Sequence, residues 1–326
     1  MPHMTLSQAF CEGVAEEMRA DPGVIVLGTD LVDRGGHFGQ IKGLGASFPD
    51  RVFDTPISEA AMVAAGVGAA LNGLRPIVDL NFMDFALGAM DEIVNQAAKM
   101  RYLFGAPVPM VIRGTAGIAL FAAQHNNSLE AAFAHTPGLL VVMPSTPSDA
   151  RALIKSAVRS DDPVIFLMHK SLTGLRGEVS TDDLPVPIGS ARVCRAGSSL
   201  TLVAYGALVA RCLHLADRLA REDIEIEVID LRSLFPLDMS TILGSADRTR
   251  HVVVVSEAPR HGGLTSEIAA TVQEELFDVL ARPVLRVGAR HAPIPHSPAL
   301  IAAAIPSEAD LERAVRWSLH GKVDES

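Results

Sequence analysis

Cysteine is scarce in this sequence, with only Cys11, Cys194 and Cys212 among 326 residues. The three lie far apart and form neither a CxxC pair nor a cysteine–histidine cluster, which argues against a disulfide framework and a zinc site. The sequence also lacks an apolar run of membrane-spanning length and a basic N-terminal region followed by an apolar run. We therefore expect a cytoplasmic protein with reduced thiols, no secretion signal and no membrane partner.

Positive charge is also in short supply. Lysine and arginine number 28 against 38 aspartates and glutamates, which gives a formal net charge of −10 and a pI of about 5.5. Nucleic acids and anionic membranes attract basic surfaces, so this balance argues against either as the main partner. Hydrophobic residues make up 48% of the chain. A chain of this length and composition is large enough for two domains with substantial cores.

The common nucleotide-binding signatures are missing. The stretch "HFGQIKGLG" at 37–45 has no GKS or GKT and is not a P-loop. In "GVGAAL", Gly66 and Gly68 resemble part of a dinucleotide fingerprint, but the third glycine is absent. The pair also lies inside a predicted helix, whereas the fingerprint needs a strand-to-helix turn. We interpret these glycines as small residues that permit close helix packing.

The first half of the chain alternates strand and helix patterns. Short apolar runs predict buried strands, and helix-like segments lie before and between them. The strands are expected at 24–28, 75–80, 108–114, 138–144 and 163–169, and the helices at 6–21, 58–72, roughly 84–104, 128–135 and 148–160. Alternation of this kind implies crossover connections and a mainly parallel sheet covered on both faces.

A change of character follows at 173–199, which is rich in Gly, Pro, Ser and Asp and reads as a linker. A second alternating block comes next. Its strands are expected at 200–206, 224–231, 251–258 and 283–289, and its helices at 207–222, 264–277 and 307–319. The fold class is therefore α/β, with two three-layer α/β/α domains that have mainly parallel sheets. We place these domains at 1–185 and 186–326.

Glu59 begins the predicted helix at 58–72, and no other polar side chain follows it until Asn72. One interpretation is a carboxylate favoured by the positive end of the helix dipole, worth under ~1 kcal/mol at an exposed site. The other interpretation is a catalytic carboxylate, because a helix that is apolar on all sides is usually buried and would shield the carboxylate from water. A carboxylate shielded from water exchanges protons readily, which favours a catalytic role.

Three further positions have both a plain and a functional interpretation. Phe82 and Phe85 in "NFMDF" lie at a strand-to-helix junction and could simply pack in the core. His125 in "AAQHNNS" precedes a predicted helix and could be an ordinary loop or capping residue. The stretch at 290–300, "RHAPIPHSPAL", has three prolines and two histidines and reads as a rigid loop ahead of the last helix.

Four segments, taken together and in this order, resemble one known family over residues from about 5 to 318. They are "DTPISEA", "GLRPIVDLNFMDFALGAMDEIVNQAAKMRYLFG", "AAQHNNSLEAAFAHTPGLLVVMPSTPSDARALIKSAVRSDDPVIF" and "APIPHSPAL". The chain is similar to the beta subunits of thiamine diphosphate-dependent 2-oxoacid dehydrogenases, a group that includes the pyruvate, branched-chain 2-oxoacid and acetoin enzymes. The resemblance implies a pyrimidine-binding transketolase-like domain followed by a transketolase C-terminal-type domain.

The resemblance also implies roles for the singled-out residues. In the family, the glutamate matched by Glu59 hydrogen-bonds a ring nitrogen of the cofactor's aminopyrimidine and so promotes deprotonation of the thiazolium carbon. The aromatic residue matched by Phe85 stacks on the aminopyrimidine, and we assign Phe82 to the same cofactor-binding surface. The histidine matched by His125 lies at the mouth of the active site and takes part in acyl transfer to lipoyl.

Partners and cofactors follow from the same resemblance. In the family, Mg²⁺ and the diphosphate are held by a "GDG" motif and a later asparagine, and this chain contains no "GDG". The resemblance therefore implies an alpha subunit that carries the Mg²⁺, an alpha2beta2 heterotetramer, and a lipoyl acyltransferase core that receives the acyl group. Some family members bind a potassium ion through backbone oxygens near the segment matching 157–162, so the resemblance allows one here.

The sequence departs from the family pattern at two places. "QHNNS" replaces "QHSQS" after His125, and "GTDL" replaces "GEDV" at 28–31, where Thr29 stands in place of an acid. Two other hypotheses stay open: the C-terminal subunit of a split transketolase, and a catalytically inactive scaffold or regulatory subunit. "DTPISE" and "IVNQAAKMRYLFG" favour the dehydrogenase over the first, and Glu59 with His125 argues against the second. The specific 2-oxoacid or acyloin is left open.

Overall fold

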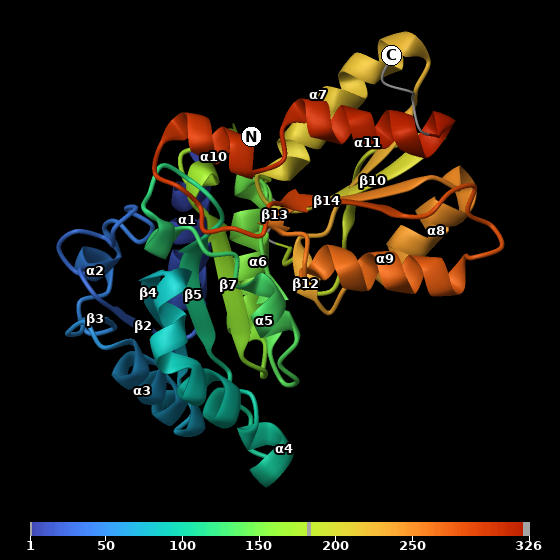
Figure 1. Ribbon diagram of the computed structural model, residues 1–326. Coiled ribbons are helices and arrows are strands. Elements are labelled where there is room, and N and C mark those ends of the chain that lie inside the picture. Colours follow the sequence, from blue (N-terminus) through green and yellow to red (C-terminus); the bar gives the residue numbers. More distant parts are fainter. Residues whose placement is uncertain (1, 181–183, 322–326) are drawn as a thin grey trace. The chain divides into compact units, whose positions relative to one another are not determined.

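The computed structural model describes residues 2–180 and 184–321 (Figure 1). It divides into two compact units. The first unit comprises the chain up to residue 116 with segments 132–188 and 234–236, and the second comprises 117–131, 189–233 and the chain from 237 onward. The predicted boundary between 185 and 186 lies close to the change of unit after residue 188. The segment 117–131, which carries His125, belongs to the second unit.

A seven-stranded sheet forms the centre of the first unit (Figure 1). Its order is β12 (Ser233–Phe235), β6 (Leu140–Val142), β7 (Val164–His169), β5 (Val111–Ala116), β4 (Arg75–Phe82), β2 (Val24–Gly28) and β3 (Val52–Asp54). The neighbouring pairs from β6 to β3 are parallel. The five strands predicted from apolar runs are all present, because strands covered on both faces need apolar side chains on both.

Helices cover both faces of this sheet. Val78 of β4 lies under Gly66 of α3 (Glu59–Leu71), whereas the next residue, Asp79, pairs with Arg113. The guanidinium of Arg113 lies over the ring of Phe10 in α1 (Leu6–Ala20). Successive side chains of a strand point to opposite faces, so α3 and α1 lie on opposite sides of the sheet. Helix α6 (Pro147–Arg159) packs against α1.

Helix α3 corrects one expectation. The sequence predicted a helix buried on all sides, but in this chain only one face is buried, the face formed by Met62, Val63, Gly66, Val67 and Ala70. Ala61, Ala64, Ala65 and Leu71 are exposed. Burial is a property of the assembly around a helix, and the apolar character of α3 does not say which chain covers it.

The segment expected as one helix at 84–104 is broken into three pieces. They are a 3₁₀ segment η1 (Met83–Ala89), a π-helical segment η2 (Glu92–Ala97) and a short helix α4 (Met100–Phe104). Gly88, a poor helix former, lies in the first piece. In the second, Asn95 Nδ2 donates to the carboxylate of Asp91 at 2.6 Å. Periodicity predicted the helical character here, but not the changes in winding.

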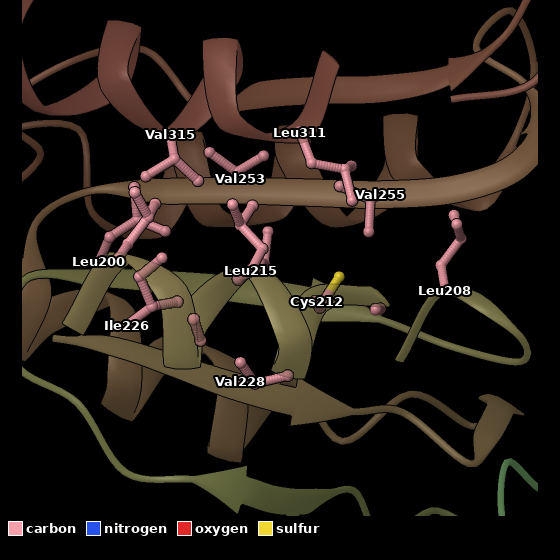
Figure 2. Close-up of a cluster of buried hydrophobic side chains, with 14 of the residues drawn as sticks. Leu200, Leu208, Cys212, Leu215, Ile226, Val228, Val253, Val255, Leu311 and Val315 are labelled. Carbon is pink, nitrogen blue, oxygen red and sulfur yellow. The ribbon is translucent and has the colours of Figure 1, made fainter. Parts of the chain in front are cut away.

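The second unit has a five-stranded sheet with the order β14 (Leu285–Ala289), β13 (Val252–Pro259), β10 (Leu200–Ala204), β11 (Ile226–Asp230) and β9 (Arg192–Arg195). The first four are parallel, and β9 is antiparallel to β11. Helices α7 (Leu208–Leu219) and α11 (Glu308–His320) pack on one face, where Leu215, Val253 and Leu311 share a buried apolar cluster (Figure 2). Helices α8 (Met239–Thr249) and α9 (Leu264–Glu275) lie on the other face (Figure 1). The α/β class with mainly parallel sheets is confirmed.

Several elements escaped the sequence patterns. The segment η4 (Lys170–Leu172) directly precedes the predicted linker. The linker itself contains β8 (Arg176–Glu178), which pairs with β1 (His3–Thr5), and β9; its residues 181–183 lie outside the described residues. Strand β12, helix α8 and helix α10 (Pro298–Ala304) were also missed, as were α2 (Leu44–Ser47) and η3 (Ala123–His125). The 3₁₀ turn η5 (Ala220–Glu222) forms the end of the helix predicted at 207–222. Helix α5 (Glu130–Ala134) falls within its predicted segment. Most of the missed elements are too short for a periodic pattern, so their positions depend on pairing with distant segments. Helix α8 is the exception, because its 11 residues are enough for such a pattern.

Candidate functional site

Glu59 is the first residue of α3 and is half-buried. The chain reaches it through a turn that is tied to β2, because the N–H of Thr55 donates to the carbonyl of Gly28 at 2.8 Å. The N-cap residue Ser58 makes no side-chain capping bond. The carboxylate therefore lies where the helix dipole favours negative charge. This placement agrees with both interpretations of Glu59, the dipole partner and the catalytic carboxylate.

Phe82 and Phe85 form an edge-to-face pair with ring centroids 6.2 Å apart. Phe82 ends β4 and is buried, whereas Phe85 lies in η1 and is 40% exposed. Plain core packing therefore describes Phe82 but not Phe85, whose ring offers an accessible aromatic surface. Segment η1 packs against α3. Its residue Asp84 forms an ion pair with Lys170, with 3.5 Å between Oδ2 and Nζ, and both side chains are fully buried.

The loop at 29–43 adds aromatic contacts that sequence reasoning missed. The rings of His37 and Phe38 lie 5.0 and 5.3 Å from the ring of Phe82, centroid to centroid. The same loop is bound to the turn ahead of Glu59, since Asp54 Oδ1 accepts the N–H of Leu31 at 2.5 Å. The only sequence signal was the position of "GGHF" in a glycine-rich loop, which does not say what the loop covers.

His125 ends the one-turn segment η3 in the second unit. Its ring lies 6.2 Å from that of Phe121, centroid to centroid. The buried Asn126 closes this loop: its Oδ1 accepts the N–H of Ala119 at 3.0 Å, and its Nδ2 donates to the carbonyls of Ala119 and Phe121. The asparagine at the departure from the family pattern therefore has a structural explanation, because it fixes the loop that carries His125.

Residues far away in the sequence anchor both sides of the His125 segment. The N–H of Ile118 donates to the Glu257 carboxylate at 3.1 Å. The hydroxyl of Tyr205 donates to Glu130 at 2.9 Å. Complete burial, followed by the charge of Glu130, raises the pKa of Tyr205 well above its usual value, so the phenol keeps its proton. Sequence reasoning missed these anchors because a lone Tyr or Glu carries no local signal of its distant partner.

A pocket of about 550 Å³ adjoins this segment within the second unit. Gln124 and Asn126, the neighbours of His125, line it together with Glu257 and His291. His291 also contacts His261, with ring centroids 5.7 Å apart. The stretch interpreted as a rigid loop at 290–300 thus supplies part of a pocket wall through residues 291–294.

The structure gathers part of the predicted site. Phe82 and Phe85 form one cluster, and η1 packs beside the helix that Glu59 begins. His125 lies in the second unit, where its own surroundings are as given above. Among residues 2–180 and 184–321, no group of three or more His, Cys, Asp or Glu side chains could hold a metal ion. No helix in the same described ranges is long and apolar enough to cross a membrane.

Comparison with known proteins defines the class first. Residues 3–175 match the family model "Transketolase, pyrimidine binding domain", and residues 189–311 match "Transketolase, C-terminal domain". The fold is similar to that of a solved structure described as "Split gene transketolase, inactive beta4 tetramer". The TM-score is 0.82 and the identity 26%, over 98% of this chain and 100% of that one. These matches define a two-domain, transketolase-like protein.

Relatives at higher identity narrow the class. The chain is 44% identical to the acetoin:2,6-dichlorophenolindophenol oxidoreductase subunit beta of Cupriavidus necator, over 98% of each chain. It is 40% identical to the pyruvate dehydrogenase E1 component subunit beta of Rhizobium meliloti, over 97% of this chain and 70% of that protein. It is also 40% identical to the 2-oxoisovalerate dehydrogenase subunit beta of Bacillus subtilis, over 92% and 94%. The chain therefore belongs to the family of beta subunits of the thiamine diphosphate-dependent 2-oxoacid and acetoin dehydrogenases.

Proposed function

We propose that this chain is the beta subunit of a dehydrogenase that decarboxylates a 2-oxoacid, or cleaves acetoin, with thiamine diphosphate and passes the acyl group to lipoyl. The single observation that carries this proposal is the agreement over nearly the whole chain with beta subunits of that group. The alternative, a subunit of a split transketolase, is supported by a structural likeness at lower identity. The apolar start of α3 at Glu59 and the exposed Phe85 ring support a catalytic subunit over an inactive scaffold.

The residues of the first unit fit the aminopyrimidine half of thiamine diphosphate. This ring needs a carboxylate for a ring nitrogen and an apolar surface for its face. Glu59 is a half-buried carboxylate, and Phe85 presents an exposed ring on a segment that packs against the same helix. When bound, the cofactor supplies the carbon that adds to the 2-oxo group and accepts the electron pair left when carbon dioxide departs.

Each residue then has a defined task. Glu59 holds a proton at the pyrimidine ring nitrogen, and the start of a rigid helix fixes the carboxylate for this purpose. Phe85 orients the ring and keeps water from it, and the buried Phe82 supports the Phe85 ring from the core side. His125 takes part in proton transfer while the acyl group passes to lipoyl. The lipoyl group is supplied by the acyltransferase core. A preorganised carboxylate is effective here because it needs no rearrangement when the proton moves.

The diphosphate and its Mg²⁺ are assigned to the alpha subunit. Mg²⁺ with a diphosphate needs oxygen ligands such as Asp and Asn. The missing "GDG" supports a site divided between two polypeptides. We therefore infer an alpha2beta2 heterotetramer. The split transketolase whose beta chains form an inactive tetramer supports this inference, since it is a fold relative whose beta chains are inactive by themselves.

The segment 157–162, where the family resemblance allows a potassium ion, is already in contact with a positively charged side chain, Arg75. The guanidinium of Arg75 donates to the carbonyls of Val158 and Ser160, at 2.9 Å each, and forms an ion pair with Asp161. These contacts satisfy two of the backbone oxygens in segment 157–162. A potassium ion there stays a prediction of the family resemblance.

Reconstitution tests the proposal. The purified chain, with and without its alpha subunit, is titrated calorimetrically with thiamine diphosphate and Mg²⁺, and both samples are assayed with a panel of 2-oxoacids and acetoin. Dichlorophenolindophenol serves as the electron acceptor. We expect weak binding and no turnover by the chain alone, and both properties in the complex. Ketol transfer between sugar phosphates would favour the transketolase alternative, and micromolar binding with full turnover by the chain alone would refute the divided site.

A further inference from the structure

One residue near the end of β4 has a left-handed backbone: Asn81, with a φ of +59°. It lies within an irregularity in the pairing of β4 with β5, between Asp79 and Phe82. Such irregularities re-aim the side chains next to them, and Phe82 follows directly. Asparagine tolerates this conformation better than most residues that have a Cβ. Asn81 therefore sets the direction in which the chain enters the Phe82–Phe85 pair.

The side chain of Asn81 joins this turn to the loop at 29–43. Its Oδ1 accepts from the backbone N–H of His37 at 3.0 Å and from Nε2 of Gln40 at 3.2 Å. Its Nδ2 donates to the carbonyl of Thr29 at 3.1 Å. One amide group thus holds the loop at three places. Long loops of this kind depend on such side-chain bonds for a single conformation.

Buried hydrogen bonds and an ion pair around Asp79 hold the backbone of Asn81 in place. The carboxylate of Asp79 accepts the N–H of Asn81 at 2.8 Å and Nε2 of Gln40 at 2.8 Å. Arg113, fully buried, donates to the same carboxylate at 3.0 Å. A buried charge is costly to leave without its partners. The position of Asn81 is therefore held by groups that cannot relax easily.

The loop at 29–43 connects the two parts of the proposed pyrimidine site. On one side, the His37 ring packs on Phe82, which contacts Phe85. On the other side, the N–H groups of Leu31 and Val32 donate to Asp54, the last residue of β3, and the turn to Glu59 follows it directly. A shift of the loop would therefore move the aromatic pair relative to the start of α3.

We propose that Asn81 is a positioning residue for the cofactor, which fixes the Phe82–Phe85 pair relative to Glu59 through the loop at 29–43. The inference rests on the proposed function, because that function assigns Glu59 and Phe85 to the aminopyrimidine. It goes beyond that function by naming a residue whose side chain bonds the loop at 29–43 and which the proposed function does not assign.

The test uses the complex with the alpha subunit. Asn81→Gly keeps the left-handed backbone accessible and removes the three side-chain bonds. We expect the dissociation constant for thiamine diphosphate to rise about tenfold. We also expect faster amide hydrogen exchange in residues 29–43 and an unfolding temperature close to that of the wild type.

A second variant, Asn81→Ala, should lower the unfolding temperature as well, because alanine disfavours a positive φ. Asp223→Gly, at a φ of +61° in the second unit, is the matched control. It should change neither the dissociation constant for thiamine diphosphate nor the amide exchange in residues 29–43.

Two results would overturn the proposal. One is an Asn81→Gly complex that binds the cofactor within about twofold of the wild type, whatever its unfolding temperature. The other is unchanged exchange in residues 29–43. If Asn81→Gly does not assemble, Gln40→Met removes the neighbouring bonds, and the same two outcomes apply. Failure of the proposed function appears separately, as a wild-type complex without decarboxylation or acetoin cleavage, because the readouts for Asn81 are binding and exchange.

Discussion

At the scale of single residues, the difference between Glu59 and any other helix-start carboxylate is its surroundings. Helix dipoles favour many exposed carboxylates by a fraction of a kcal/mol. Glu59 instead begins a helix whose following residues, up to Leu71, are all apolar, and it shares that helix's neighbourhood with the ring of Phe85. We propose that this combination lets the carboxylate hydrogen-bond a ring nitrogen of the aminopyrimidine.

Glu59→Gln should nearly abolish turnover and leave the unfolding temperature unchanged. The amide has almost the same shape, but it cannot share a proton with a ring nitrogen as a carboxyl group can. Decarboxylation by the reconstituted complex with an artificial acceptor measures the effect. Activity within about threefold of the wild type, or on the order of 0.6 kcal/mol of barrier, would contradict the assignment.

His125→Ala should impair acyl transfer to lipoyl more than decarboxylation. The segment that carries His125 is held by hydrogen bonds on both sides of it, from Ile118 to Glu257 and from Tyr205 to Glu130. Removal of the imidazole should therefore leave the loop in place. Both half-reactions are measured on the variant complex, and Asn127→Ala, on the same loop, is the control. Equal losses in both half-reactions would indicate a general organising role, and no loss in either would favour an ordinary loop histidine.

At the scale of elements, α3 shows why "GVG" is a packing motif. A Cβ added to Gly66 would lie 2.5 Å from Cγ2 of Val78 and 2.9 Å from Cε of Met110, so only glycine allows this contact between helix and sheet. A Cβ added to Gly68 would meet nothing within 4 Å in this chain. The interpretation as close packing is confirmed for Gly66, and Gly68 faces the other way.

These two glycines form a matched pair of tests. Gly66→Ala should destabilise the isolated chain by about 1–3 kcal/mol through overpacking. Gly68→Ala should leave stability unchanged or raise it by up to about 1 kcal/mol, because alanine is the better helix former. Urea denaturation of both variants measures the difference. A Gly66→Ala chain as stable as the wild type would show that β4 and α3 can separate without cost.

At the scale of the whole molecule, two helices of the first unit, α3 and α4, expose apolar side chains. Besides the open face of α3, the α4 side chains of Tyr102, Leu103 and Phe104 are exposed, at 88%, 57% and 72%. Extended apolar surfaces of this kind mark sites where other chains bind. The proposed alpha subunit gives them a partner, and in its absence they favour self-association.

Ala64→Glu should block assembly with the alpha subunit and leave the fold of the isolated chain intact. Ala64 is exposed on α3, so a carboxylate there meets water in the isolated chain but would be buried at an interface, which is costly. Sedimentation of the mixed subunits measures assembly. Ala270→Glu, at an exposed position of α9, controls for the charge and the helix. Normal heterotetramers with Ala64→Glu would exclude this face as the interface.

The sequence alone determined the features that depend on local pattern. Continuous apolar runs fixed the main strands because strands covered on both faces need apolar residues at every position. Amphipathic or small-residue periodicity fixed α1, α3, α7 and α11. Motif order gave the family, and with it Glu59, Phe85 and His125 as candidates, whose roles stay predictions until the variants are measured.

Only the tertiary structure decided how distant segments meet. The network of Asp79, Arg113, Gln40 and Asn81 joins three separate stretches of the chain, and none of them signals its partners locally. The same holds for Tyr205 with Glu130, and for the single covered face of α3. Local patterns record what each segment needs to bury or pair. Which segment satisfies that need depends on the path of the whole chain, because contacts between distant residues form only when the fold brings them together.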